Sequence, residues 1–405
     1  MRGNTLNTLR RSGLVISLAG FAISVNTLPA LVSWFSVQLG VPVASFGVIF
    51  LLQYASYTIC SLTIGRLYAS RRLPLLGIVI VALFISAMCL FWIGAIPSFG
   101  LLIVAMIVIG GTGGLVESIG TMLITTSNGS NRMLYSSQFF YAIGAFFAPM
   151  AVGFLLYLEL PVPVIGHVIG VFSLLISLVV AICVYQPWKT KLESDARQET
   201  QATEHAPAEA RGASTIRAHR WAFPFLFFTM VFYVILESSV GNWFAVYVHE
   251  ALHATSSQAS FSLSMFWIGL SISRFWYVVL IIRNLQRTLF GHIAMIVLAV
   301  LLILFVPAHG AMWLLYGAIL LFGIGCGPVW PLLIEFCSYR FARKHLIMYL
   351  VAAGSIGALL GPIVTSTLFS LVGIDHIVVL YAGYSVLMVA AAITTVTLLN
   401  RTQPG

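Results

Sequence analysis

Charged residues are scarce in this sequence. Asp, Glu, Lys and Arg together make up 8% of its 405 residues, whereas soluble proteins average roughly 25%. Apolar residues make up 60%, and they form long continuous runs rather than the alternating segments of about ten residues that build outer-membrane barrels. The shortage of charge therefore excludes an ordinary soluble domain, and the composition predicts an all-α polytopic membrane protein.

Motifs for metal binding, disulfide formation and phosphate binding are also missing. The five cysteines fall inside or at the ends of apolar runs, without the CxxC or Cys/His spacing of metal sites. The sequence has no Gly-x-x-x-x-Gly-Lys-Ser/Thr loop, the motif that cradles the phosphates of ATP. We therefore expect neither an enzyme nor an ATP-driven pump, and no metal or other cofactor.

Hydropathy divides the chain into twelve predicted spans. At about 1.5 Å rise per residue, each run is long enough to cross a hydrocarbon layer of about 30 Å. The first six predicted spans cover about residues 13–37, 46–68, 74–95, 98–126, 132–157 and 163–186. The last six cover about residues 221–249, 257–282, 287–307, 310–334, 340–371 and 376–400. An even number of spans places both termini on the same side of the membrane.

Basic residues are absent from the loops on one side. The charged residues of these loops are Glu159, Glu250 and Asp375, whereas 19 of the 20 Lys and Arg residues fall in the other loops, at the span ends that adjoin them and at the termini. Because Lys and Arg stay on the cytoplasmic side, the pattern predicts a multi-pass protein of the cell inner (plasma) membrane with both termini cytoplasmic. Topology also accounts for the net charge of +9, so we expect no nucleic-acid partner.

One long polar stretch, residues 187–220, interrupts the spans. It holds too few apolar residues to order itself firmly. We interpret it as a cytoplasmic linker between an N-terminal six-helix bundle, residues 1–186, and a C-terminal six-helix bundle, residues 221–405.

An internal repeat supports this division. Three motifs recur at a shared offset of about 210 residues, and parallel six-helix repeats around a site at the membrane midplane are typical of secondary transporters. The pairs are Gly65-Arg66-Leu67 with Ser273-Arg274-Phe275, Gly110–Gly114 with Gly323–Gly327, and Gly144…Pro149 with Gly357…Pro362.

The loop after the second span reads Gly65-Arg-Leu-Tyr-Ala-Ser-Arg71-Arg72. With the twelve spans and the repeat, it resembles the signature of the major facilitator superfamily, Gly-x-Leu-x-Asp-Arg-x-Gly-Arg-Lys, although the Asp is lost. The resemblance implies two six-helix bundles that work by alternating access. It also makes Arg66, Arg71 and Arg72 candidate gating residues.

Within that superfamily, two short motifs resemble the fucose-permease-like sugar:proton symporters. They are Gly111-Thr-Gly-Gly-Leu-Val-Glu117 and Glu237-Ser-Ser-Val-Gly-Asn-Trp243, and Gly-Pro-type ends of the fifth and eleventh spans accompany them. The resemblance implies uptake of a sugar coupled to a proton. One departure matters, because the first-span acid of the fucose permease has no carboxylate counterpart here, and the nearest polar residue is Asn26.

Two carboxylates lie well within the spans, Glu117 in the fourth and Glu237 in the seventh. Burying a charged carboxylate at that depth costs several kcal/mol, so an acid there is by default a functional hypothesis. Tyr233 and Gly241 share the helix face of Glu237. We predict that the two acids carry the coupling proton or grip the solute. The alternative for each is a structural hydrogen bond between helices.

Amide and aromatic side chains supply the other candidates for substrate binding. Amides offer donors and acceptors for sugar hydroxyls, and aromatic rings stack on the apolar face of a pyranose. The alternatives are hydrogen bonds between helices for the amides and packing or interface anchoring for the rings. The candidates are Asn26, Gln53, Gln138, Tyr57, Tyr141, Trp243 and Trp330.

Charged residues at the inner ends of spans are candidates for a gate. Glu335 ends the tenth span close to Arg340, which predicts a gating or structural salt bridge. Arg274 lies in the inner half of the eighth span. We expect it to neutralise helix-end carbonyls or to pair with a neighbour.

These features together predict a secondary active transporter of a small polar solute, with a sugar as the expected substrate and a proton as the coupling ion. We expect a monomer surrounded by membrane lipid. One alternative is a proton-driven exporter of amphipathic compounds, because Gly144–Pro149 partly resembles an antiporter signature, with Ala148 in place of its second Gly. Another is a non-transporting nutrient sensor, although such sensors usually add a long soluble tail.

Overall fold

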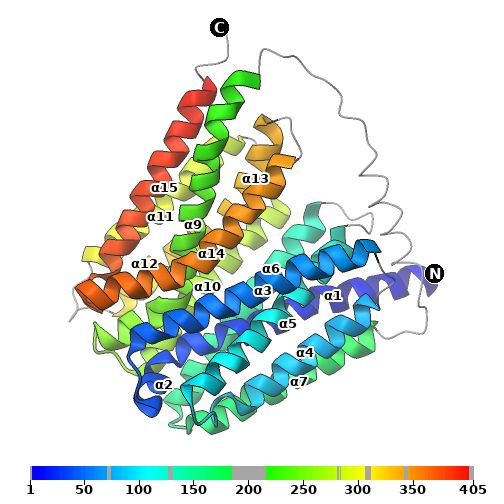
Figure 1. Cartoon of the computed structure of the whole chain (residues 1–405), viewed down its shortest axis with the longest axis vertical. Coiled ribbons are helices and arrows are strands. Elements are labelled where there is room, and N and C mark those ends of the chain that lie inside the picture. The colour runs from blue at the N-terminus through cyan, green and yellow to red at the C-terminus, as the bar shows by residue number, and fades with distance from the viewer. Residues whose placement is uncertain are drawn as a thin grey trace.

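The structure, a computed structural model, describes residues 2–70, 74–125, 131–184, 216–280, 282, 284–305, 312–341 and 345–400. These residues are almost entirely helical, which confirms the predicted fold class (Figure 1). The first half contains α1 (Arg2–Asn26), α2 (Val32–Leu39), α3 (Phe46–Ser70), α4 (Leu75–Ile93), α5 (Phe99–Thr125), α6 (Asn131–Tyr157) and α7 (Val162–Val184). The second half contains α9 (Ile216–Glu250), α10 (Ser256–Val279), α11 (Leu285–Phe305), α12 (Met312–Cys326), α13 (Val329–Arg340), α14 (His345–Val372) and α15 (Ile377–Asn400).

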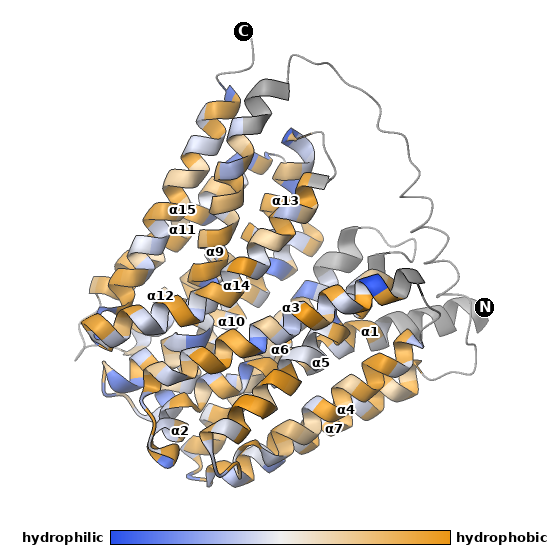
Figure 2. Cartoon of the chain, viewed as in Figure 1, coloured by the Kyte–Doolittle hydropathy of each residue, from blue (hydrophilic) through white to orange (hydrophobic). Residues whose placement is uncertain are grey.

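Most of these helices are built to lie in a membrane. Eleven stretches of the described residues are long and apolar enough to cross one, and Figure 2 shows hydrophobic residues along most of their length. The predicted span that is not among the eleven is α10, which is 24 residues long but rich in serine and contains Arg274. Serine hydroxyls of α10, such as those of Ser264 and Ser271, donate to carbonyls of the preceding helical turn. The helix can therefore satisfy these serine hydroxyls without water.

Two predicted spans are not continuous helices. The first is interrupted after α1 by a short 3-10 helix, η1 (Leu28–Ala30), that contains Pro29. The tenth predicted span consists of two helices, α12, which ends at Cys326, and α13, which begins at Val329. Proline has no backbone N–H and disfavours a helical conformation in the residue before it. The prolines therefore explain both interruptions, which the hydropathy pattern alone did not show.

Several predicted helix ends need correction. α1 begins at Arg2 rather than at residue 13, and α14 begins at His345 rather than at residue 340. α9 begins at Ile216, not at residue 221, because the helix extends into the stretch interpreted as linker. The tenth span continues through α13 to Arg340 rather than ending at residue 334. The rest of the predicted linker, residues 187–215, lies outside the described residues, so the division into two domains remains a prediction.

The glycines of the internal repeat make equivalent contacts in the two halves. Gly110 and Gly114 of α5 lie so close to the backbone of α3 that a Cβ atom would overlap it. In the second half, Gly323 of α12 lies equally close to the backbone of α10. The fourth span thus packs on the second as the tenth packs on the eighth.

The pair of motifs that contains Gly144 and Gly357 also shows close helix packing in both halves. Gly144 of α6 lies against the backbone of Ala19 in α1, and Gly357 of α14 lies against the backbone of Val231 in α9. Small residues allow membrane helices to approach this closely. The repeat read from the sequence is therefore a repeat of helix packing.

The two halves contact each other along α6 and α10 and along α3 and α14. The Ser257 hydroxyl donates to the Gly153 carbonyl at 2.8 Å, and Gly47 lies against the side chain of Ser366. Figure 1 shows the halves meeting at the end of the molecule near α2 and separating toward the end where both termini lie. The ribbons of the two halves thus lie together at one end of the molecule and diverge toward the other.

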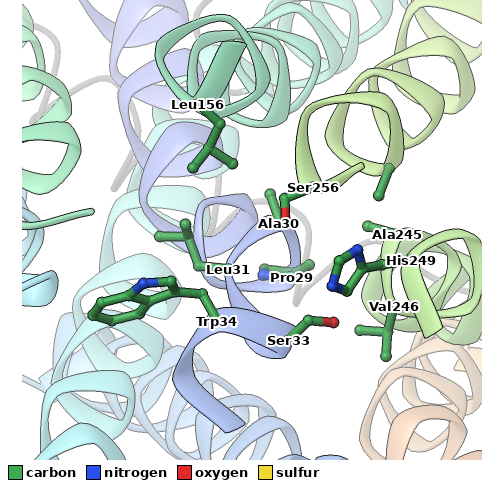
Figure 3. Close-up of a pocket in the computed structure, with 11 residues that line it drawn as sticks. Pro29, Ala30, Leu31, Ser33, Trp34, Leu156, Ala245, Val246, His249 and Ser256 are labelled. Atoms are coloured by element: carbon green, nitrogen blue, oxygen red, sulfur yellow. The ribbon is translucent and has the colours of Figure 1, made fainter. Parts of the chain in front are cut away.

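A small cavity marks the end where the halves lie together (Figure 3). It lies between the halves, lined by Pro29 and Trp34 from the first half and by His249 and Ser256 from the second. Its volume is about 30 Å³, which is room for about one water molecule. It is therefore a packing gap between the two halves and is too small to hold a sugar.

Candidate functional site

Glu117 lies at the contact between α5 and α3. The Tyr57 hydroxyl donates to its Oε2 at 2.7 Å, and the Tyr57 ring stacks on Phe21 of α1, with centroids 6.0 Å apart and planes 15° apart. The close approach of Gly114 to the backbone of Tyr57 allows this geometry, because it brings the two helices together one turn away. The acid and the tyrosine, both predicted from the sequence, thus form one hydrogen-bonded unit.

Arg274 of α10 connects the acid of the second half to both halves of the molecule. Its Nη2 lies 4.0 Å from Glu237 Oε1, with exposed fractions of 8% for the arginine and 16% for the acid side chain. Its Nε donates to the Gly327 carbonyl at 3.1 Å and its Nη1 to the Gln138 carbonyl of α6 at 3.2 Å. Both roles predicted for Arg274, a helix-end carbonyl partner and a charge partner, are present together.

The interruption of the tenth span leaves the Gly327 carbonyl without a helical donor, and Arg274 bonds to this carbonyl. In a continuous helix the Gly327 carbonyl would accept from the N–H of residue 331, but that residue is Pro331 and has no N–H. Arg274 supplies the missing donor. The preceding carbonyl, that of Cys326, accepts from the Tyr233 hydroxyl at 2.9 Å, and Tyr233 also lies within hydrogen-bonding reach of Glu237.

The amide candidates lie near these groups but differ in how they are used. Asn26 donates to its own helix at the Ala22 carbonyl, 2.9 Å away, and lies within hydrogen-bonding reach of Tyr141. Gln53 is buried, with 3% of its surface exposed. Gln138 contacts Arg274 through its backbone carbonyl, so that contact does not depend on its amide side chain.

Asn242 is an amide that we did not predict as a site residue. Its Nδ2 donates to the Ser238 carbonyl at 2.7 Å and approaches the Tyr54 hydroxyl of the other half at 3.3 Å. The sequence did contain a signal, because Asn242 belongs to the motif that begins with Glu237.

The aromatic rings of the first half gather around Phe21. Its ring centroid lies 6.0 Å from that of Tyr57 and 5.7 Å from that of Tyr141. Tyr141 in turn faces Trp267 of α10, with centroids 6.3 Å apart. We did not predict Trp267, although it lies seven residues before Arg274 and therefore on the same helix face.

Trp243 occupies a different environment from the one its motif predicted. It is 0% exposed, its Nε1 donates to the Pro362 carbonyl at 2.9 Å, and its ring packs edge-on against Phe50 and Phe369. Its contacts match the packing alternative, and we leave it out of the proposed site. Trp330 is partly buried, and its Nε1 lies beside Gly354.

The candidate gating residues lie at helix ends. Arg66 and Glu335 are exposed, while Arg340 donates to Gln286 Oε1 at 3.3 Å and lies 6.0 Å from the centre of the Phe336 ring. The other two, Arg71 and Arg72, lie outside the described residues. Arg66 lies nine residues beyond Tyr57 on α3, a distance of about 13 Å along the helix.

Arg274 thus joins Glu237 to the contact between the halves, and Glu117 lies within electrostatic range of the same guanidinium. Arg274 interacts electrostatically with Glu117 as well as with Glu237, and aromatic and amide side chains surround them. A polar site between two helical repeats, next to an interrupted helix, is the arrangement of a secondary transporter.

Comparison with known families identifies the family. The chain matches the model of the Major Facilitator Superfamily over residues 12–362, and it belongs to that superfamily. It is thus a membrane transporter with a small-molecule substrate. No curated protein sequence matches it.

Solved structures with the same fold include transporters of different solutes. A mutant of the nucleoside transporter NupG aligns with a TM-score of 0.69 and 13% identity, covering 96% of this chain and 99% of that one. A bacterial homologue of the human lysosomal transporter Spinster, in an inward-facing and unoccupied conformation, gives 0.63 and 13%, covering 98% and 96%. The human organic anion transporter MFSD10 gives 0.60 and 16%, covering 96% and 98%. At these identities the likeness shows the fold and not the solute.

Proposed function

We propose that this protein moves a small polar solute, with a sugar as the expected substrate, by alternating access coupled to protons. The observation that carries the proposal is the charge balance between the halves. Glu237 lies 4.0 Å from Arg274, and Glu117 lies within electrostatic range of the same guanidinium. One guanidinium balances one carboxylate, and an unbalanced anion at membrane depth is costly. Binding one proton removes that cost.

Glu117 is the proposed proton carrier. The hydrogen-bonding partner of its carboxylate is the neutral Tyr57 hydroxyl, whereas Glu237 faces the charged Arg274. A carboxylate next to a guanidinium stays ionised more readily than one next to a phenol, because the opposite charge stabilises the anion. We therefore assign to Glu237 and Arg274 the binding of polar groups of the solute.

The groups around these charges support a solute rich in hydroxyls. Tyr57, Tyr141 and Phe21 offer ring faces, and Asn26 and Gln53 offer amides that both donate and accept. This mixture fits a sugar, whose ring has apolar faces and polar edges.

The end of the molecule at which the halves diverge gives the proposed direction of access. The halves separate on the side of the termini (Figure 1), and the distribution of Lys and Arg predicts that the termini are cytoplasmic. The structure then represents an inward-facing state. In this state the solute and the proton would be released to the cytoplasm.

Reconstituted vesicles test the proposal. Wild-type protein should accumulate at least one of a panel of radiolabelled hexoses and pentoses when an inward proton gradient is applied. Glu117→Gln approximates the protonated acid, so it should still exchange that sugar between the two sides without a gradient but fail to accumulate it. Glu159→Gln, in the turn that follows α6, is the control and should accumulate like wild type. The proposal fails if wild type accumulates no sugar, or if Glu117→Gln accumulates it normally.

A further inference from the structure

Trp267 carries a buried hydrogen-bond donor without a partner. Its side chain is 6% exposed, and its Nε1 has no hydrogen-bond acceptor among the residues that the structure describes. Buried indole N–H groups usually find an acceptor. Trp243, at the same interface, shows the usual arrangement, since its Nε1 donates to the Pro362 carbonyl. The N–H of Trp267 therefore needs an explanation of its own.

The edge of the indole that bears this N–H faces a glycine. A Cβ atom added at Gly241 of α9 would meet Cζ2 of Trp267 at 3.4 Å and Phe266 at 3.9 Å. In the indole ring, Cζ2 and Nε1 are bonded to the same carbon, so this is the donor edge. Gly323, in contrast, is in hard contact with the backbone of α10. Gly241 thus leaves space for about a methyl group beside the donor edge, while Nε1 itself is buried.

The surroundings of Trp267 belong to the proposed transport site. Its ring faces that of Tyr141, which is close to Asn26. Asn242, next to Gly241, approaches Tyr54 of the other half at 3.3 Å. Arg274 lies two turns further along the same face of α10. The unpaired donor therefore lies where side chains of the two halves meet.

We propose that Trp267 binds the transported solute directly, donating its Nε1–H to a hydroxyl oxygen while the Tyr141 ring contacts the solute's apolar face. This inference rests on the proposed function and adds a binding residue from the second half. An indole nitrogen can only donate, so the group that it recognises must be an acceptor. The role of Gly241 is to keep a larger side chain away from the donor edge.

Indole resonances test the contact without knowledge of the natural solute. Protein labelled with ¹⁵N-tryptophan is titrated separately with a hexose mixture, a pentose mixture and uridine, and the Trp267 signal is assigned by its loss in Trp267→Phe. We expect the Trp267 signal to shift with a sugar while that of the exposed Trp276 stays in place. A shift with uridine alone would support the contact but overturn the sugar as substrate. A Trp267 signal that moves with none of these probes overturns the inference.

An affinity measurement then separates hydrogen bonding from packing. Trp267→Phe should bind the probe that shifted the signal about three- to tenfold more weakly, which corresponds to one lost neutral hydrogen bond. Against a deoxy analogue that lacks the accepting hydroxyl, the mutant and wild type should bind equally. Trp276→Phe, on the same helix, should match wild type throughout. An equal loss of affinity for the parent probe and every deoxy analogue would show a packing effect and contradict the proposed donor.

Discussion

Arg274 interacts with three residues that lie in three different parts of the chain. It approaches the Glu237 carboxylate at 4.0 Å and donates to the carbonyls of Gly327 and Gln138. Because Gln138 belongs to the first half and the other two residues to the second, one side chain connects the charge state of the site to the contact between the halves. The removal of either charge should therefore be felt as a loss of stability as well as of transport.

Double substitution of the Glu237–Arg274 pair tests this at the residue scale. Glu237→Gln leaves the buried guanidinium without its neighbouring anion and should lower the free energy of unfolding by about 1–3 kcal/mol. Arg274→Gln should cost a similar amount. The double mutant should be less destabilised than the sum of the two, because neither member of the pair is left without the other. Chemical unfolding in detergent measures these values, and strictly additive losses would show that the pair does not interact.

Helix packing depends on a few glycines that hold neighbouring spans together. Gly144 and Gly357, which the repeat relates, both lie against the backbone of another helix. Other glycines do not have this role, since a Cβ atom at Gly291 of α11 would meet nothing within 4 Å. The loss of stability on replacing a glycine by alanine should therefore depend on where that glycine lies in the fold.

Alanine substitution at these glycines is the test at the scale of the element. Gly144→Ala should force α6 away from α1 and lower the free energy of unfolding by about 1–3 kcal/mol, the usual range for overpacking. Gly291→Ala should be neutral or stabilise by up to about 1 kcal/mol, because alanine favours a helix more than glycine does. Unfolding in detergent again gives the comparison. Equal effects at both positions would contradict the packing role of Gly144.

The orientation of the whole molecule in the membrane follows from charge rather than from packing. The helices fix which loops lie on the same side, but either side could face the cytoplasm as far as helix contacts are concerned. The loops around Glu159, Glu250 and Asp375 contain no Lys or Arg, and this asymmetry predicts that they face outward.

Cysteine labelling tests the orientation. In a background without the five native cysteines, Leu160→Cys should react with a membrane-impermeant maleimide added outside intact cells. Thr200→Cys, in the predicted linker, should react only after the cells are opened. Labelling of both positions from the same side would contradict the predicted topology.

The sequence by itself determined the features that depend on neighbouring residues in the chain. Runs of apolar residues fixed the helices, because a span must satisfy its backbone internally. The positions of Glu117 and Glu237 deep within their spans marked the site, and the shared offset of the glycine motifs showed the repeat. The ends of the first, seventh and tenth spans were less predictable, because proline interruptions and helix extensions change hydropathy little.

Only the tertiary structure decided which side chains meet. Tyr57 and Glu117 are 60 residues apart in the chain and Tyr54 and Asn242 are 188 apart, and no local periodicity specifies such pairs. The same limit explains why Trp243 was expected at the substrate while Trp267 was overlooked. Whether an indole N–H is already bonded depends on carbonyls brought close by helix packing, and the sequence records the donor without recording its partner.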